Sequence, residues 1–338
     1  MPRQACWHCL EVKDHWGVKT VPIRRRYGGV VVSLLPCRHA ARILHGRALK
    51  AHNKENDMTM QPLVKLADGT IMPQLGLGVW QASNEQATAA VTEALNVGYR
   101  SIDTAAIYKN EVGVGKALQE TAIPRSDIFI TTKLWNSDQA HPRQALEESL
   151  RKLQLEYVDL YLIHWPLPEQ NTYVEAWRGL LNLREQGLAK SVGVCNFNPH
   201  HLQRLKEETG VMPVINQVEL HPLFQQRMLQ TWNTTHHIQT ESWSPLAQGG
   251  EGVFDHPVIH ALAKKYGKTP AQIVIRWHLD SGLVVIPKSV TPARIRENFA
   301  VFDFRLEKEE LSDIATLDCG KRLGPDPDQP RTDAPRKD

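Results

Sequence analysis

The sequence predicts an α/β fold, a (β/α)8 TIM barrel, from two observations. Eight short apolar runs alternate with amphipathic helical segments from residue 75 onward, which is typical of a parallel sheet. All eight units fall within roughly 250 residues, the usual length of a closed barrel. We expect an N-terminal β-hairpin plug before the barrel and an extra C-terminal helix after it.

The hairpin comes first in the chain. Residues 62–66 and 70–72 are separated by Asp68-Gly69, a typical turn pair. The eight candidate strands that follow are rich in Val and Ile and carry apolar residues on both faces, as buried parallel strands do. They span residues 75–78, 100–104, 128–133, 158–164, 191–195, 214–218, 240–244 and 284–287.

The intervening helices carry boundary signals. Ser83 begins one helix as a cap, and Gly98 closely follows its end. Pro142, and the Thr-Pro pairs at Thr269 and Thr291, place proline at early helical positions. The extra helix is expected over residues 307–317.

Charge divides the chain into parts. Residues 1–57 hold 11 Lys/Arg and 4 Asp/Glu, whereas the remaining 281 residues are net −4. We expect residues 1–57 to be a basic extension, disordered or a non-native leader, with a targeting peptide as the less favoured alternative. The barrel domain is expected at 58–324, and a Pro-rich flexible tail at 325–338.

Composition also bears on the location and partners of the protein. No run approaches the ~18 apolar residues that a membrane helix needs, and the acidic body argues against nucleic acid binding. Only two of the five cysteines lie after residue 57. A disulfide framework is therefore not implied, which favours a reducing, cytoplasmic location.

Four polar residues follow three consecutive strands, at the barrel end where active sites lie. They are Asp103, Tyr108, Lys133 and His164. An ammonium within about 4–6 Å lowers the pKa of a phenol, so Tyr108 beside Lys133 could protonate a substrate oxygen. Asp103 would hold Lys133, and a neutral His164 could orient a carbonyl group.

Other interpretations of these residues stay open at this point. Each one alone could cap a loop, pack in the core or carry a surface charge, although their joint occurrence favours catalysis. Lys133 would also suit a Schiff-base aldolase on the same barrel. A barrel that binds NADP without turnover is a further alternative.

A phosphate site is expected after strands seven and eight, where such barrels often bind phosphate. Lys288 and Arg294 supply positive charge there, while Ser289 and Thr291 supply hydrogen-bond donors beside a helix start. A 2′-phosphate fits this set, so NADP is favoured over NAD. The sequence has no Rossmann fingerprint.

The run Gly98-Tyr-Arg-Ser-Ile-Asp103-Thr-Ala, followed by Glu111 and Val114-Gly115, resembles the first signature of the aldo-keto reductases. Residues 61–329 resemble that superfamily throughout, and the bacterial 2,5-diketo-D-gluconate reductases in particular. The resemblance implies that Asp103, Tyr108, Lys133 and His164 are the catalytic tetrad. His164 stands where relatives that reduce steroid double bonds carry Glu, which favours carbonyl reduction.

The resemblance also implies a cofactor site. Asn196 and Gln217 match the residues that hold the nicotinamide carboxamide, and Trp243 matches the aromatic residue that stacks on the ring. One departure is Cys195, where many members have Ser. The full set of expected cofactor contacts is Asn196, Gln217, Trp243, Ser244, Leu246, Gln248, Gly249, Lys288, Ser289, Val290, Thr291, Arg294 and Asn298.

Substrate contacts are expected from Trp80, His164 and Trp165. No anion clamp for a sugar acid stands out in the sequence. We expect no metal site; a zinc site at Cys6, Cys9, Cys37 and His39 is a weak alternative.

Together these features predict a monomeric, cytoplasmic, NADPH-dependent reductase of ketones and aldehydes. The resemblance implies reduction of 2,5-diketo-D-gluconate to 2-keto-L-gulonate, and activity on methylglyoxal and β-keto esters.

Overall fold

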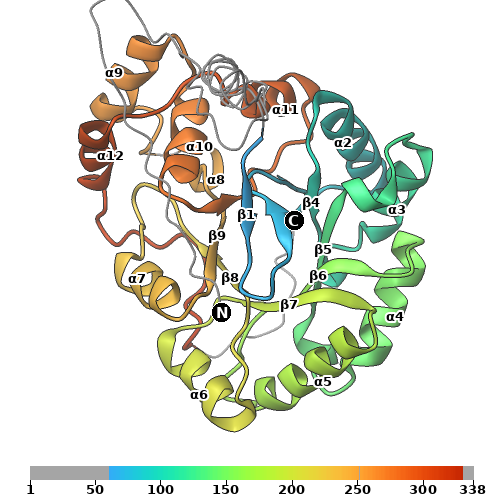
Figure 1. Ribbon diagram of the computed structural model, residues 1–338. Coiled ribbons are helices and arrows are strands. Elements are labelled where there is room, and N and C mark those ends of the chain that lie inside the picture. Colours follow the sequence, from blue (N-terminus) through green and yellow to red (C-terminus); the bar gives the residue numbers. More distant parts are fainter. Residues whose placement is uncertain (1–60, 251, 330–338) are drawn as a thin grey trace, which may run out of the picture. The chain divides into compact units, whose positions relative to one another are not determined.

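The computed structural model describes residues 61–250 and 252–329 (Figure 1). These residues fall in the larger of two compact units, Glu55–Asp338. The expectations for residues 1–57 and 330–338 lie outside the described residues, and so does the alternative zinc site. Among the described helices, none is long and apolar enough to cross a membrane.

The hairpin consists of β1 (Leu63–Lys65) and β2 (Ile71–Pro73), which pair antiparallel as predicted. Gly69 takes φ +93° in the turn, a conformation that favours glycine. Ser191 donates a hydrogen bond to Asp68 Oδ2 at 2.7 Å, and Met72 is fully buried in a cluster with barrel residues such as Leu160. The hairpin therefore plugs the barrel at the end where the strands begin.

Eight parallel strands form the barrel, in the order of the chain. They are β3 (Leu77–Gly78), β4 (Ser101–Asp103), β5 (Phe129–Leu134), β6 (Val158–Ile163), β7 (Ala189–Cys195), β8 (Ile215–Glu219), β9 (Gln239–Trp243) and β10 (Val284–Val285). The first and last strands meet where Gly76 N–H donates to Val285 O at 2.9 Å and Gly78 bridges to Lys288. The predicted (β/α)8 fold is confirmed.

Helices surround the strands. They are α2 (Asn84–Val97), α3 (Glu111–Glu120), α4 (Pro142–Leu153), α5 (Tyr173–Glu185), α6 (Pro199–Thr209), α7 (Arg227–Thr235), α8 (Ala247–Gly250), α9 (Pro257–Tyr266), α10 (Pro270–Asp280), α11 (Pro292–Phe299) and α12 (Lys308–Ala315). Short 3-10 turns occur at η1 (Ala106–Tyr108), η2 (Arg125–Asp127) and η3 (Asn136–Asp138). The predicted extra helix is α12.

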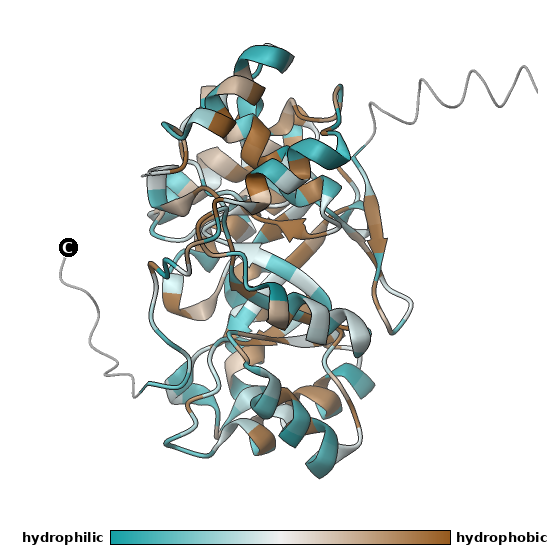
Figure 2. Cartoon of the chain, turned by 90° about the vertical axis from the view of Figure 1, so that its left-hand side faces the viewer, coloured by the Kyte–Doolittle hydropathy of each residue, from teal (hydrophilic) through white to brown (hydrophobic). Residues whose placement is uncertain are grey.

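The capping signals explain where several helices begin. Ser83 and Thr269 each accept a hydrogen bond from the backbone N–H three residues later and form a complete capping box. In α4, Leu146, Leu150 and Leu153 are buried on one face. Figure 2 shows hydrophobic and hydrophilic residues on the same helices, as amphipathic packing requires.

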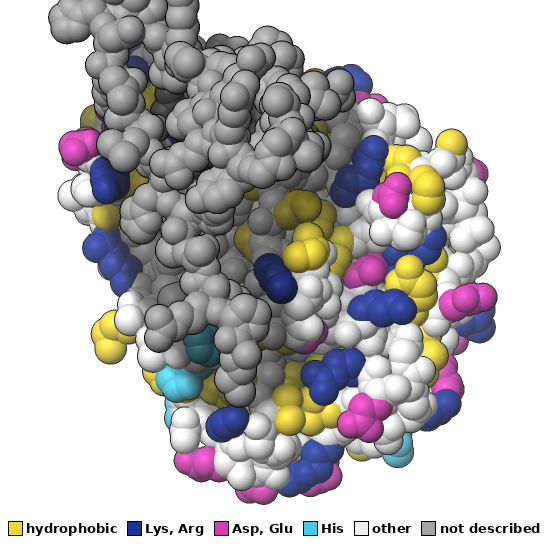
Figure 3. All heavy atoms as spheres, viewed as in Figure 1, with side chains coloured by type: hydrophobic (Ala, Val, Ile, Leu, Met, Phe, Trp, Pro, Cys, Tyr) yellow, Lys and Arg dark blue, Asp and Glu magenta, His cyan; other side chains and the backbone are white. Residues whose placement is uncertain are grey.

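The charged side chains of the barrel surface are mixed in sign. Figure 3 shows Lys and Arg interspersed with Asp and Glu over the described part of this face. Several of the ion pairs link exposed side chains one helical turn apart, such as Arg143 with Glu147 on α4. Exposed pairs of this kind contribute little to stability, about 0–1 kcal/mol each.

Candidate active site

The four predicted catalytic residues meet at the barrel end where the strands finish. Asp103 is the last residue of β4, and Tyr108 ends η1 just beyond it. Lys133 lies near the end of β5, and His164 directly follows β6. Parallel neighbouring strands end at the same rim, which is why residues far apart in the sequence come together at this point.

Lys133 and Asp103 form a buried ion pair. Lys133 Nζ lies 2.5 Å from Asp103 Oδ1 and donates a second hydrogen bond to Thr104 O at 2.8 Å. Burial is the largest single influence and lowers the pKa of Lys133, but the charge and hydrogen bond of Asp103, together with Tyr108 and Cys195, outweigh it and raise the lysine pKa. Lys133 is therefore held as an ammonium.

Tyr108 lies against this ammonium, with Lys133 Nζ 5.1 Å from the ring centroid. Burial raises the pKa of Tyr108 to about 12, whereas Lys133 acts to lower it. The expectation that Lys133 lowers this pKa is correct in direction, but burial has the larger effect. At neutral pH Tyr108 thus retains the proton that it would donate, and Lys133 favours the phenolate left after the transfer.

His164 completes the group. Its ring packs edge-on against Tyr108, with centroids 5.8 Å apart, and against Trp135, with centroids 5.1 Å apart. A carbonyl placed between His164 and Tyr108 would thus face two hydrogen-bonding side chains. This arrangement suits proton transfer to a substrate oxygen.

Asn196 connects two other predicted site residues, His164 and Trp243. Its Nδ2 donates to His164 O at 3.0 Å, and its Oδ1 accepts from Trp243 Nε1 at 2.9 Å. Asn196 has φ +63°. Non-glycine residues adopt this conformation rarely, and those that do are frequently found at functional sites. One amide hydrogen and one oxygen lone pair remain for a nicotinamide carboxamide.

Gln217 lies deeper in the barrel and is bonded to two carboxyl groups. Its Nε2 donates to Asp103 Oδ2 at 2.8 Å and to Glu241 Oε2 at 3.0 Å. Cys195 Sγ lies 3.9 Å from Gln217 Oε1, as a weak donor. Glu241 was not among the residues predicted from the sequence; the available signal was an acidic residue in the middle of a candidate barrel strand.

The expected phosphate site surrounds the start of α11. Lys288 and Arg294 are exposed, and neither forms an ion pair with a described acidic residue. Thr291, the N-cap, makes no side-chain capping bond, and Ser289 Oγ accepts from Thr291 N at 3.1 Å. Asn298 is buried behind them on the same helix. Helix N–H groups without a side-chain cap, next to two exposed cations, fit a phosphate group.

The loop after β9 has an irregular backbone. Ser244, Ala247 and Gln248 have φ between +48° and +53°, and Gly249 has φ +114°. Leu246 is partly buried against the core. This loop can therefore present backbone groups at positions that a regular helix or strand would not allow.

The predicted substrate residues differ in exposure. Trp80, just after β3, is 43% exposed, whereas Trp165 is only 5% exposed. Trp80 is thus the tryptophan more available to a ligand. Gln139 Nε2 donates to Trp165 O at 2.8 Å and fixes the backbone there.

The C-terminal segment returns to this end of the barrel, which the sequence pattern did not indicate. Leu323 N and Gly324 N donate to the Glu219 carboxylate at the end of β8, at 2.6 and 2.8 Å. A Cβ atom on Gly324 would lie 2.5 Å from Trp243 Cη2, so its backbone packs directly on that indole. The first residues of the expected flexible tail are therefore bound: Asn198 Nδ2 donates to Asp328 Oδ2 at 2.7 Å.

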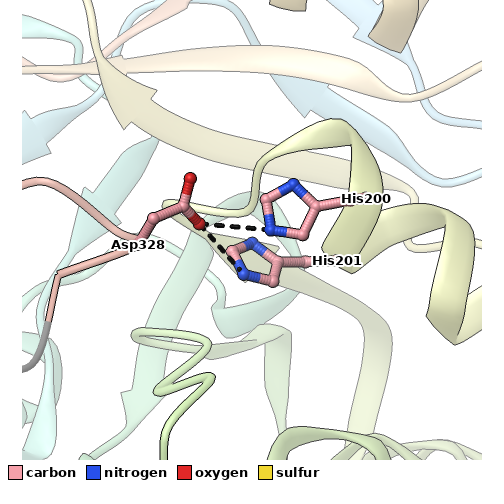
Figure 4. Close-up of side chains that lie close together, drawn as sticks. All are labelled: His200, His201 and Asp328. Atoms are coloured by element: carbon pink, nitrogen blue, oxygen red, sulfur yellow. Dashed lines mark ion pairs between the residues drawn. The ribbon is translucent and has the colours of Figure 1, made fainter.

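Two histidines of α6 also hold this segment. Figure 4 shows His200 and His201 directed at one oxygen of Asp328, at 3.2 and 3.3 Å. The three side chains offer ligand atoms within 4.8 Å of one another, close enough together for a metal ion. However, His201 Nδ1 accepts the Asn198 backbone N–H, so in the neutral ring Nε2 carries the hydrogen and has no lone pair for a metal ion. These contacts favour a latch for the segment over a metal site.

The chain is similar in sequence to known proteins. The aldo/keto reductase family model matches residues 69–251 and 255–318. Methylglyoxal reductase DkgA of Yersinia pestis is 72% identical over 271 residues, which are 80% of this chain and 98% of that protein.

Solved structures agree with this comparison. An aldo/keto reductase from Brucella melitensis is 53% identical with a TM-score of 0.74, covering 77% of this chain and all of that one. A Gox0644 mutant in complex with NADPH is 47% identical with a TM-score of 0.77, covering 81% and 100%. The family match spans most of the barrel and includes all four residues at its mouth. The chain therefore belongs to the aldo/keto reductase family.

Proposed function

We propose that this protein reduces ketones and aldehydes to alcohols with NADPH, using Tyr108 as the proton donor. The observation that carries the proposal is the Tyr108–Lys133–Asp103 arrangement beside His164. The ammonium of Lys133 favours the phenolate that forms when Tyr108 gives up its proton. His164 orients the carbonyl oxygen, and Asp103 keeps Lys133 charged and in place.

The cofactor would extend from the barrel mouth to α11. Trp243, Asn196 and Gln217 would hold its nicotinamide end, and Lys288 with Arg294 its 2′-phosphate. When bound, NADPH supplies a hydride from the nicotinamide ring to the carbonyl carbon. The NADPH complex of the Gox0644 mutant supports this choice of cofactor.

The aldolase alternative is less well supported. A Schiff-base lysine must be a free amine to attack a carbonyl. Lys133 instead donates to Asp103 and Thr104 O, and its pKa is raised. Borohydride trapping with substrate should therefore give no covalent adduct at Lys133.

We propose methylglyoxal as a substrate, because the 72% identical relative is named for that activity. Reduction of 2,5-diketo-D-gluconate to 2-keto-L-gulonate and of β-keto esters is also proposed, from the resemblance alone. NADPH oxidation, followed by absorbance, tests all three on one plate. Turnover with none of these carbonyls would favour the non-catalytic NADP-binding barrel.

We further propose that the protein acts as a monomer in the cytoplasm. Both described cysteines, Cys195 and Cys319, are free thiols, which fits a reducing compartment. Light scattering coupled to size-exclusion chromatography measures the oligomeric state. A mass near twice 38.3 kDa would contradict the monomer.

A further inference from the structure

Glu241 is a buried carboxyl group inside the barrel that the proposed reaction does not use. It lies in the middle of β9 and has no exposed surface. In the strand register, Glu241 pairs with Gln217 on β8, and Gln217 pairs with Cys195 on β7. Register partners in parallel strands point to the same face, so these three side chains form one layer below the barrel mouth.

The Gln217 amide bridges Glu241 to Asp103. Both carboxyl oxygens accept from the same nitrogen, at 3.0 and 2.8 Å, so they lie within about 6 Å of each other. Both hydrogens of Gln217 Nε2 are thereby used. Its oxygen Oε1 accepts the weak Cys195 thiol donor at 3.9 Å and keeps a second lone pair that can accept a hydrogen bond from a carboxamide.

Of the two carboxyl groups, Asp103 alone is bonded to Lys133. Lys133 Nζ bonds to Asp103 Oδ1 and to Thr104 O, and neither bond reaches Glu241. Glu241 Oε1 has no hydrogen-bond partner among the described residues. Burial, together with the nearby Asp103 carboxylate, raises the pKa of Glu241 to about 8. Lys133 thus pairs with Asp103, and the surroundings of Glu241 favour its neutral form.

We propose that Glu241 is a positioning residue that fixes the Gln217 amide toward the cofactor and supports proton donation by Tyr108 only while it carries its own proton. This inference rests on the proposed function, since it acts through Asp103 and Gln217. The titratable groups around Glu241 are Asp103 on β4, Lys133 on β5 and Cys195 on β7. Ionised Glu241 adds a second negative charge to this group and makes Tyr108 a weaker acid.

The test is the pH dependence of kcat/KM for methylglyoxal reduction in wild type and Glu241→Gln. Glutamine still accepts from Gln217 Nε2 but cannot ionise. We expect equal activity near pH 7, a wild-type loss of about tenfold between pH 7 and pH 9, and a loss below about twofold in the variant. An alkaline loss that is the same in both proteins overturns the proposal.

Glu111→Gln is the matched control. Glu111 is also buried and has a raised pKa, mainly because of burial. It accepts from Thr132 Oγ1 at 2.7 Å, and Thr132 points to the opposite face of β5 from Lys133. Glu111→Gln should lose activity at alkaline pH as the wild type does. If Glu111→Gln also keeps its activity there, the effect is general to buried carboxyl groups and is not specific to Glu241.

A binding measurement separates this inference from the proposed function. Glu241→Met removes the acceptor that holds Gln217, and NADPH binding is followed by quenching of protein fluorescence, without any carbonyl. We expect the Kd for NADPH to rise about fivefold in Glu241→Met and to stay near wild type in Glu241→Gln. An unchanged Kd in Glu241→Met overturns the positioning role, even if no carbonyl tested is reduced. Absence of turnover in wild type, with this shift in Kd, contradicts the proposed function alone.

Discussion

Lys133 illustrates how a single residue depends on its partners. A buried ammonium is unstable without a counter-charge, and Asp103 provides it at 2.5 Å. The same pair places positive charge next to the Tyr108 ring. The sequence predicted that these residues lie at one end of the barrel, because each stands at or shortly after the end of an apolar strand, and the family resemblance then implied their roles.

The roles of two other residues, Glu241 and Glu219, could not be predicted from the sequence. Glu241 and Glu219 are acidic residues within or at the end of strands, and their pattern does not distinguish a buried carboxyl from an exposed one. Their roles depend on partners far away in the chain: Asp103 through Gln217 for Glu241, and the Leu323–Gly324 backbone for Glu219.

His201 gives a residue-scale prediction about stability in acid. Burial lowers its pKa to about 4, with a further lowering from His200 and an opposing effect of Asp328. Since its ordinary pKa is near 6.5, the folded state favours neutral His201; the resulting stability is present above pH 6.5 and is lost as pH falls toward 4.

His201→Gln should therefore reduce the fall in Tm between pH 7 and pH 4.5. Glutamine can still accept from Asn198 N, as the third residue of a capping box does, but it does not titrate. Thermal melts at the two pH values measure this difference. An equal fall in Tm in both proteins would show that His201 contributes nothing to acid sensitivity.

At the scale of elements, the alternation of strands and helices was predicted well, and strand lengths less well. The first and eighth strands were predicted over four residues each, but β3 and β10 have two. These two strands close the barrel through a few hydrogen bonds between Gly76, Gly78 and the β10 region. Apolar runs indicate a strand, but its paired length depends on the neighbour.

The start of α11 gives a prediction about cofactor choice. Arg294→Ala should raise KM for NADPH about tenfold and leave KM for NADH almost unchanged, because only NADPH has the 2′-phosphate. Arg296→Ala is the matched control, since Arg296 lies on the same helix but pairs with Glu93 on α2. Equal effects of Arg294→Ala on both cofactors would place the phosphate elsewhere.

The contact between α2 and α3 depends on Gly113. A Cβ atom there would lie 2.2 Å from the backbone oxygen of Asn84. Gly113→Ala should force the helices apart and cost about 1–3 kcal/mol in the free energy of unfolding. Denaturant unfolding measures this. Val112→Ala, at a neighbouring 52% exposed position, should change it little; similar values for both variants would contradict the close contact.

At the scale of the whole molecule, the hairpin lies at one end of the barrel and the proposed active site at the other. The hairpin closes the end where the strands begin, through Met72 and the Ser191–Asp68 hydrogen bond. The C-terminal segment returns to the opposite end, where Gly324 packs on Trp243 and Asp328 binds α6. The sequence predicted the hairpin from its local turn, but the return of the segment depends on contacts between residues over 100 positions apart.

The central claim is that Tyr108 donates the proton in carbonyl reduction. The most direct measurement is kcat for NADPH oxidation with methylglyoxal in Tyr108→Phe, with NADPH binding measured on the same sample. Tyr157→Phe serves as control, because Tyr157 precedes β6 at the opposite end of the barrel. We expect Tyr108→Phe to bind NADPH normally and to lose at least about 100-fold in kcat, while Tyr157→Phe keeps wild-type activity. Full activity in Tyr108→Phe would contradict the role of this residue as proton donor.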